Sequence, residues 1–125
     1  MSRPFRCIAP LVLAGAIAVA LSIPAASGAA TTCKISLKTA RSLGPTYVTQ
    51  LKQSGTSCSY AVKVTRAFHT CRLKHGKRGR CTTKVLGYSC SDRRPADEMI
   101  PTQFTGYVIC KHGGARITHT YQQDT

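Results

Sequence analysis

Apolar residues recur at helical spacing in one stretch near the middle of the chain. At 3.6 residues per turn, the two faces of this stretch differ in polarity. One face carries Tyr60, Val64, Ala67, Phe68 and Cys71, and the other carries Ser59, Lys63, Arg66 and Thr70. Thr56 or Ser57 is a suitable N-cap for the otherwise unpaired backbone N–H groups of a helix start. The pattern predicts an amphipathic helix from Ser57 to about Leu73 with a basic outer face.

After this helix the spacing of apolar residues changes to every second position, which is typical of strands. The candidate strands are 83–90, 103–110 and 115–121. Gly113 and Gly114 separate the last two, which predicts a hairpin. Before the helix 45–55 reads as a further strand, 33–44 is ambiguous, and 91–102, which holds two prolines, is predicted to be an exposed loop. We expect an α+β fold, with one amphipathic helix packed on a three- to four-stranded antiparallel sheet.

The first thirty residues have the order of a secretory signal peptide. Arg3 and Arg6 form a positive leader, an uncharged run covers 11–23, and small residues follow. This run is shorter than the roughly 20 residues of a bilayer-spanning helix, and no second apolar stretch follows it. We expect cleavage near Ala29 or Ala30 and an extracellular, freely secreted product.

The domain predicted to remain, 30–125, is a single small unit, and 1–29 is the predicted signal peptide. Cys7 leaves with the signal, so six cysteines stay, and an even number in a small exported domain predicts disulfide bonds. They are Cys33, Cys58, Cys71, Cys81, Cys90 and Cys110. Cys71 and Cys81 bracket a turn and are expected to pair. Strand directions favour Cys58–Cys90 and Cys33–Cys110 for the rest. The alternative, Cys33–Cys58 with Cys90–Cys110, puts opposite strand ends together and requires bent strands.

Some of these residues give the chain a resemblance to a loose group of small secreted actinobacterial proteins. In that group a TSC-x-x-A helix start is followed by a strand cysteine and by a V-x-C-x-G-G hairpin. Within Thr56–Tyr121 the matching positions are Cys58, Ala61, Cys90, Cys110, Gly113 and Gly114. This chain departs from the group by carrying Cys71 and Cys81 around a basic segment. The resemblance implies the fold and export, and it adds no activity.

Positive charge is concentrated in one part of the chain. The formal net charge is +14, and it falls to +12 when Arg3 and Arg6 leave with the signal; no acidic residue precedes Asp92. A basic field of this kind attracts polyanions. The candidate polyanion-binding residues are Lys63, Arg66, Arg72, Lys74, Lys77, Arg78, Arg80 and Lys84. The same residues also fit an ordinary solvated turn.

The four histidines are the other candidates for a functional site, either catalytic or metal-binding. His69 on the helix and His119 on a strand face are the better pair for a ribonuclease, in which one imidazole takes a proton and another returns it. His75 and His112 lie in Gly-rich turns and are predicted to be solvated. The spacing of His69, Cys71, His75 and Cys81 resembles no zinc finger, so we expect no metal and no cofactor.

These patterns together favour a secreted cationic binding module for an anionic surface or polymer. The polyanion could be a cell-wall polymer, a lipid headgroup or a nucleic acid, because all three satisfy the charge. Sparse aromatic residues in the basic segment argue against base stacking. We expect a monomer without a transmembrane segment. The alternatives are a small secreted ribonuclease or phosphodiesterase that uses histidines, and a scaffold or inhibitor that docks on a protein through the hairpin.

Overall fold

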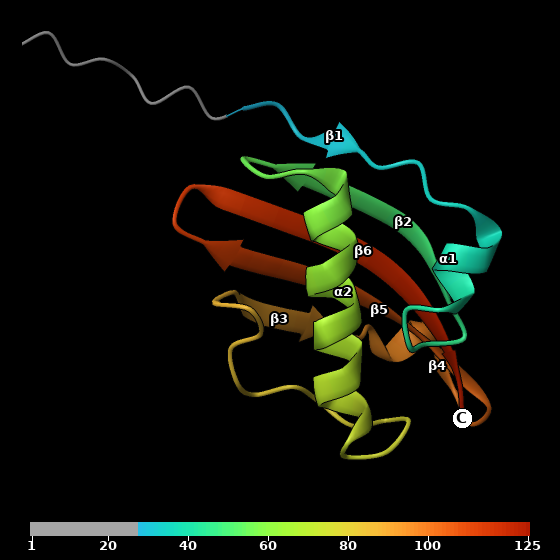
Figure 1. Cartoon of the computed structure of the whole chain (residues 1–125). Helices are drawn as coiled ribbons and strands as arrows, with labels where there is room; N and C mark the ends of the chain where they lie inside the picture. Colours follow the sequence, from blue (N-terminus) through green and yellow to red (C-terminus); the bar gives the residue numbers. More distant parts are fainter. Residues whose placement is uncertain (1–27) are drawn as a thin grey trace, which may run out of the picture.

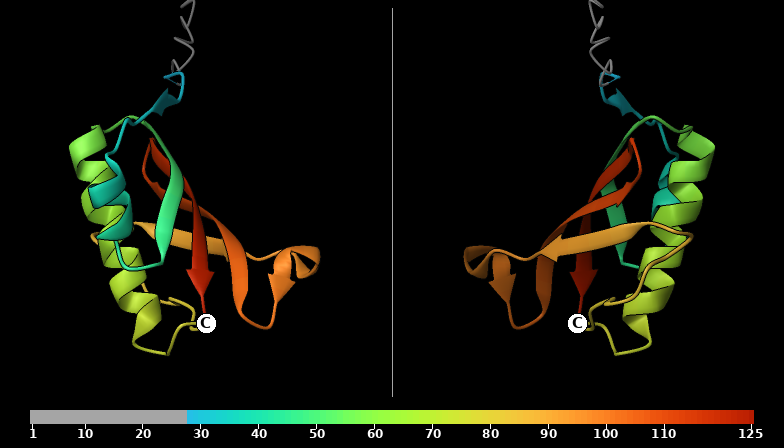
Figure 2. Two further views of the ribbon diagram at one scale, coloured as in Figure 1. Left: turned by 90° about the vertical axis from the view of Figure 1, so that its right-hand side faces the viewer. Right: turned by 90° about the vertical axis from the view of Figure 1, so that its left-hand side faces the viewer.

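One long helix lies across one face of an antiparallel sheet (Figures 1 and 2). The computed structural model describes residues 28–125, so nearly all of the predicted signal peptide lies outside the described residues. The fold is α+β with one main helix, as predicted, but the sheet has six strands rather than three or four. Among residues 28–125, no helix is long and apolar enough to cross a bilayer.

The sheet is built around a central hairpin. Its strands are β1 (Thr31–Thr32), β2 (Tyr47–Ser54), β3 (Ser89–Arg93), β4 (Met99–Ile100), β5 (Gln103–His112) and β6 (Ala115–Asp124). They follow the order β1-β2-β6-β5-β3, and β4 also pairs with β5. In the hairpin, His112 lies opposite Ala115, so Gly113 and Gly114 form the two-residue turn that the sequence predicts. A short helix α1 (Leu37–Arg41) and a 3₁₀ turn η1 (Ala96–Glu98) complete the chain.

The main helix α2 (Cys58–Leu73) has nearly the predicted bounds. The Ser57 side chain accepts a hydrogen bond from the backbone N–H of Tyr60 at 3.2 Å and caps the helix. Val64 and Phe68 are fully buried against the sheet, as their helical spacing predicts. Tyr60 differs, because it lies at the edge of the core with 37% of its surface exposed and its ring 6.2 Å from that of Tyr88.

The inner face of β6 confirms the predicted alternation. Ile117, His119, Tyr121 and Gln123 are buried, and the residues between them are partly exposed. Phe104 and Val108 of β5 are buried on the same side of the sheet as these residues. The core therefore combines apolar side chains with several polar ones, and the polar ones require hydrogen-bond partners.

The strand predicted for 83–90 is wrong in its bounds. Residues 85–88 form a tight turn in which the backbone N–H and C=O groups of Val85 and Tyr88 bond each other at 2.9 Å. The strand β3 begins after this turn and continues to Arg93, inside the segment 91–102 that was expected to be an exposed loop.

The disulfide bonds follow from this strand order. Cys71 pairs with Cys81 as expected, but the other two predicted pairs are wrong. The structure joins Cys33 to Cys58 and Cys90 to Cys110. Cys90 stands directly opposite Cys110 in the β3–β5 register, because β3 begins beside this residue instead of ending at it. No bent strand is needed for that bond.

The other bond is explained by the position of Cys33 beside β2. Its backbone N–H donates to the carbonyl of Leu51 at 2.8 Å, so the chain runs alongside β2 here. Residues 55–57 then lead from the end of β2 into α2, which begins at Cys58. The two cysteines therefore meet where β2 passes into the helix.

A close approach between β5 and β6 gives a test of this packing. A Cβ atom at Gly106 would lie 2.2 Å from Cε1 of Tyr121, and the Tyr121 ring is fully buried and cannot move aside. We expect Gly106→Ala to lower the free energy of unfolding by about 1 to 3 kcal/mol, the usual range for overpacking. Urea denaturation measures the change.

Gly114→Ala is the matched control, because a Cβ at that position meets nothing within 4 Å. It should change the free energy of unfolding by about 0.5 kcal/mol or less. Equal losses at the two positions would contradict the packing described here.

Candidate functional site

The arginine nearest the end of α2 lies inside the protein. Arg72 has no exposed surface, although the sequence placed it in the basic patch, so that prediction is corrected. Its Nε donates to Nδ1 of His69 at 2.9 Å, and its Nη2 donates to Oε1 of Gln123 at 2.6 Å. The guanidinium also lies over the ring of Tyr121, 4.7 Å from the centroid. Arg72 therefore links α2 to β6 through polar contacts in the core.

The two candidate catalytic histidines do meet, but in the interior. His69 and His119 are 0% and 3% exposed, and their Nε2 atoms lie 3.1 Å apart. Because the Nε of Arg72 is always a donor, Nδ1 of His69 must accept, and a neutral His69 then carries its proton on Nε2. That proton is donated to Nε2 of His119, which holds its own proton on Nδ1. Neither ring faces solvent, so neither can exchange a proton with a bound phosphodiester.

A second buried cluster lies around the side chain of Asp92. Oδ2 of Asp92 accepts from Nη2 of Arg94 at 2.6 Å and from the hydroxyl of Tyr121 at 2.9 Å. The side chains of Arg94 and Asp92 are only 3% and 5% exposed. The sequence placed Asp92 in a solvated loop, and the structure corrects this because β3 extends through it. Tyr121 joins this cluster to the cluster around Arg72.

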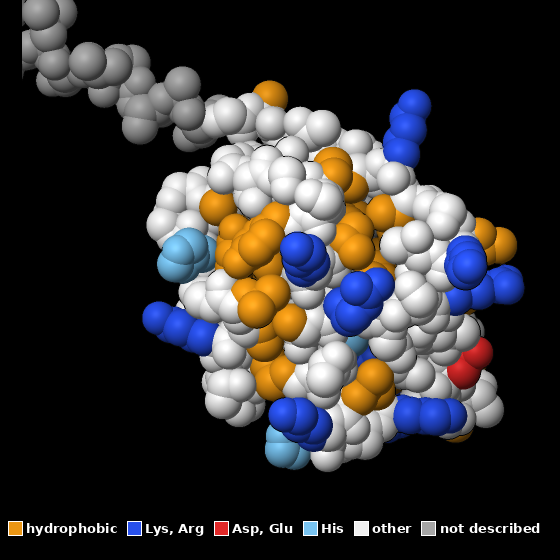
Figure 3. Space-filling view, in the orientation of Figure 1, with side chains coloured by type: hydrophobic (Ala, Val, Ile, Leu, Met, Phe, Trp, Pro, Cys, Tyr) orange, Lys and Arg blue, Asp and Glu red, His pale blue; other side chains and the backbone are white. Residues whose placement is uncertain are grey.

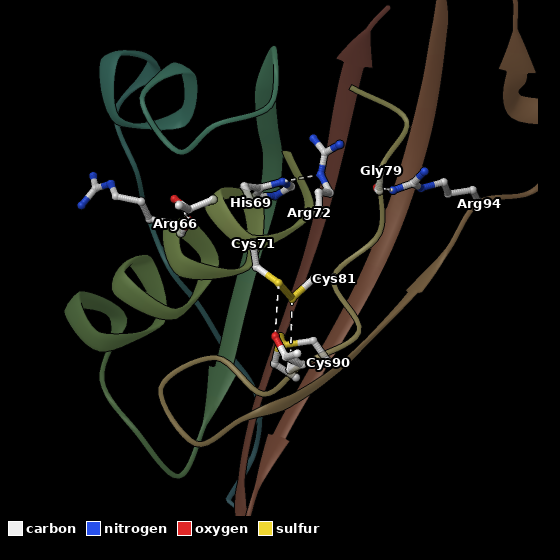
Figure 4. The surroundings of a disulfide bond; sticks show 11 residues. Arg66, His69, Cys71, Arg72, Gly79, Cys81, Cys90 and Arg94 are labelled. Carbon is white, nitrogen blue, oxygen red and sulfur yellow. Dashed lines mark hydrogen bonds between the residues drawn. A yellow bond between two sulfur atoms is a disulfide. The ribbon is translucent and has the colours of Figure 1, made fainter. Parts of the chain in front are cut away.

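Buried and half-buried guanidinium groups hold the basic turn against the sheet. Arg72 donates to the carbonyl of Lys77 at 2.6 Å. Arg94 donates to the carbonyls of Arg78 and Gly79 at 2.7 and 2.6 Å. Figure 4 shows Arg94 and Gly79 joined in this way, and it shows Arg66 extending away from the strands. The turn that follows α2 is therefore ordered by contacts to its backbone as well as by the Cys71–Cys81 bond.

Two more of the predicted patch residues donate hydrogen bonds to backbone carbonyl groups. Arg78 donates to the carbonyls of Ile100 and Pro101 at 3.0 and 2.9 Å. Arg80 donates to the carbonyl of Asp92 at 2.7 Å. Both side chains remain exposed, and one nitrogen of each guanidinium group is held by backbone carbonyls, so these two residues differ from cations that have no partner.

The other five predicted residues are exposed and have no side-chain hydrogen bond or ion pair within residues 28–125. They are Lys63, Arg66, Lys74, Lys77 and Lys84. All of them except Lys77 line one surface groove of about 460 Å³. The groove lies between the outer face of α2 and residues 83–85, and its lining within the described chain includes no carboxylate.

The floor of this groove is partly apolar. Ala67, Cys71 and Val85 line it together with the hydroxyl residues Thr70 and Thr83. In the space-filling view of this face, hydrophobic side chains gather beside α2, with Lys and Arg side chains on both sides of them (Figure 3). The arrangement suits a ligand that carries several negative charges.

One residue beside the groove has an unusual backbone conformation. Leu86 has a φ of 48° and Gly87 a φ of 82°, and together they form the two central positions of the turn from Val85 to Tyr88. Positive φ at both positions defines a type I′ turn, which favours Asn, Asp or Gly. The residue found here is an apolar leucine, and 53% of the surface of Leu86 is exposed. No signal in the sequence points to this residue, because Leu-Gly is not a usual pair for such a turn.

The other chemistries considered from sequence find no support in this arrangement. Within the described part of the chain, no three His, Cys, Asp or Glu side chains are grouped as metal ligands would be. Cys71 and Cys81 are bonded to each other, so neither sulfur is a free thiolate. His75 and His112 are exposed, and Nδ1 of His112 bonds the carbonyl of Gly87 at 2.9 Å.

No protein-family model, curated protein or solved structure matches this chain. A functional proposal therefore depends on the charge and shape of the groove itself. Of the eight predicted patch residues, the groove is lined by Lys63, Arg66, Lys74 and Lys84 and not by Arg72, Lys77, Arg78 and Arg80.

The burial of the two histidines also affects stability. Burial, followed by the neighbouring His119 and Arg72, lowers the pKa of His69 far below its usual 6.5. Burial, followed by Arg72, lowers the pKa of His119 to about 3. Both histidines take up protons in the unfolded chain near pH 6.5 and resist protonation when folded. Stability is therefore complete above about pH 6.5 and is lost as the pH falls below that value.

We expect the free energy of unfolding to fall by about 1.4 kcal/mol per pH unit for each buried histidine, or about 2.7 for both, between about pH 4 and pH 6. His119→Gln removes one of these groups and keeps a side chain that accepts a hydrogen bond. In urea denaturation at several pH values, this variant should reduce the slope of the free energy of unfolding against pH by about half.

His75→Gln is the control, because His75 is exposed. This variant should leave the slope unchanged. A wild-type free energy of unfolding that stays constant between about pH 6 and pH 4 would contradict the assignment of two neutral buried histidines.

Proposed function

We propose that this protein is a secreted cationic module that binds an anionic surface or polymer through the groove beside α2. The observation that carries the proposal is the set of four lining cations without an internal partner, Lys63, Arg66, Lys74 and Lys84. Three disulfide bonds in a small domain fit an extracellular protein. Export itself is inferred from the sequence.

The order of the surrounding backbone supports this role. Lys74 follows the last residue of α2, where the turn is held by Arg72 and by the Cys71–Cys81 bond. Lys84 lies three residues beyond Cys81, and Thr83 contacts Sγ of Cys71 at 3.5 Å. Cations on an ordered backbone lose less conformational entropy on binding than cations on a mobile loop.

The residues that line the groove also indicate which property of a ligand is recognised. Its lining includes no aromatic ring on which a nucleobase could stack. Three of its four cations are lysines, whose flexible ammonium groups provide charge without a fixed hydrogen-bonding pattern for a particular base or sugar. We therefore expect binding that depends on the density of negative charge in the ligand and falls steeply with salt.

A charge-matched pair of variants tests the site. The groove variant replaces all four cations by glutamine: Lys63→Gln, Arg66→Gln, Lys74→Gln and Lys84→Gln. The control replaces four exposed cations outside the groove: Lys38→Gln, Arg41→Gln, Lys111→Gln and Arg116→Gln. Both variants lose the same charge.

Affinity for dextran sulfate beads is measured at several salt concentrations. We expect the groove variant to lose about 100-fold in affinity at low salt and most of the salt dependence, because fewer counter-ions are released on binding. The control should lose about tenfold or less, through the weaker overall field. Equal losses in the two variants would show that the groove is not the binding site.

A further inference from the structure

The exposed leucine beside the groove is held where a polar residue would fit better. Leu86 and Gly87 are the central residues of a type I′ turn, and Leu86 adopts a left-handed backbone conformation with a φ of 48°. Side chains other than Gly, Asn and Asp rarely adopt this conformation. Strain of this kind at an exposed position points to a function for the side chain.

The turn is anchored at both ends and leaves Leu86 exposed. Val85, which precedes it, is buried, and Tyr88, which closes the turn, is 3% exposed. The ring of Tyr88 lies 5.3 Å from that of His112, whose Nδ1 bonds the carbonyl of Gly87 at 2.9 Å. Leu86 is therefore displayed at the tip of an anchored turn and is not a side chain of a loose loop.

This apolar tip adjoins the cations. Val85 and Lys84, the two residues before Leu86, both line the basic groove. Tyr60 of α2 is 37% exposed and packs near Tyr88 of the same turn. One surface thus carries exposed apolar side chains beside several free cations, as Figure 3 shows for the face of α2.

We infer that this surface docks on the face of an anionic lipid bilayer, with Leu86 entering the boundary between headgroups and acyl chains. The inference rests on the proposed function, since it names the ligand class of the same groove. Lysine and arginine attract anionic headgroups, and an exposed leucine or tyrosine is stabilised at the bilayer interface. A water-soluble polyanion offers no apolar phase for Leu86, so the lipid surface accounts for both features together.

Leu86→Asn tests the inference with little risk to the fold. The change makes the Asn-Gly pair that type I′ turns favour, so the melting temperature should stay the same or rise. Ile100→Thr is the matched control, because Ile100 is also 53% exposed but lies in β4, away from the groove. Both variants keep every charge.

Binding is measured by co-sedimentation with vesicles of phosphatidylcholine and phosphatidylglycerol in equal amounts, with pure phosphatidylcholine vesicles for comparison. We expect wild-type protein to bind only the anionic vesicles and Leu86→Asn to bind them about tenfold more weakly, as partial burial of a leucine requires. Ile100→Thr should bind like the wild type. Affinity for dextran sulfate should be unchanged in both variants.

The remaining outcomes separate the two proposals. Binding to dextran sulfate without binding to anionic vesicles, or vesicle binding that Leu86→Asn leaves unchanged, would overturn the lipid inference and leave the proposed function in place. An equal loss of vesicle and dextran sulfate binding in Leu86→Asn would also overturn it, because Leu86 would then act on the groove. Failure to bind either ligand would reject the proposed function itself.

Discussion

The guanidinium group of Arg72 is the contact on which the rest of the basic region depends. It is fully buried, and it bonds His69 in its own helix, Gln123 in β6 and the carbonyl of Lys77 in the turn. A buried cation is tolerated only when its donors are paired, and removing partners leaves an uncompensated charge. One side chain thus fixes the end of α2, the sheet beneath it and the turn that follows.

The basic residues of this region divide into two groups with different roles. Arg72 and Arg94 are buried and bind carbonyl groups of the turn. The planar guanidinium fork suits this task, because it directs several donors in fixed directions. The lysines and Arg66 lie on the outer face without internal partners and remain available to ligands. The high charge of the sequence is therefore partly structural, and the remainder forms the surface through which we propose binding.

The features that the sequence predicted correctly are local ones. The helix α2, the β5–β6 hairpin and the Cys71–Cys81 bond depend on residues close together in the chain. The other two disulfides depend on which strands are neighbours, and the start of β3 depends on a Leu-Gly turn that gives no usual signal. These features require the tertiary arrangement.

The burial of Arg72 could have been suspected from sequence. It lies four residues after Phe68 and eight after Val64, on the face of α2 that packs on the sheet. Because charged residues are rarely fully buried, the residue type alone predicts that Arg72 is exposed to solvent. Its partners Gln123 and Tyr121 lie about fifty residues away, and no local pattern links them to the helix.

The division between buried arginines that hold the turn and exposed cations that are free to bind is tested most directly by NMR. The measurement is a spectrum of the arginine Nε–H groups, with and without dextran sulfate. The Nε–H groups of Arg72 and Arg94 donate to His69 and Asp92, so they should exchange slowly with water and keep their positions when the polymer is added. The Nε–H of Arg66 should exchange quickly and should shift. Fast exchange at Arg72 and Arg94, or shifts there that match the shift of Arg66, would contradict the account.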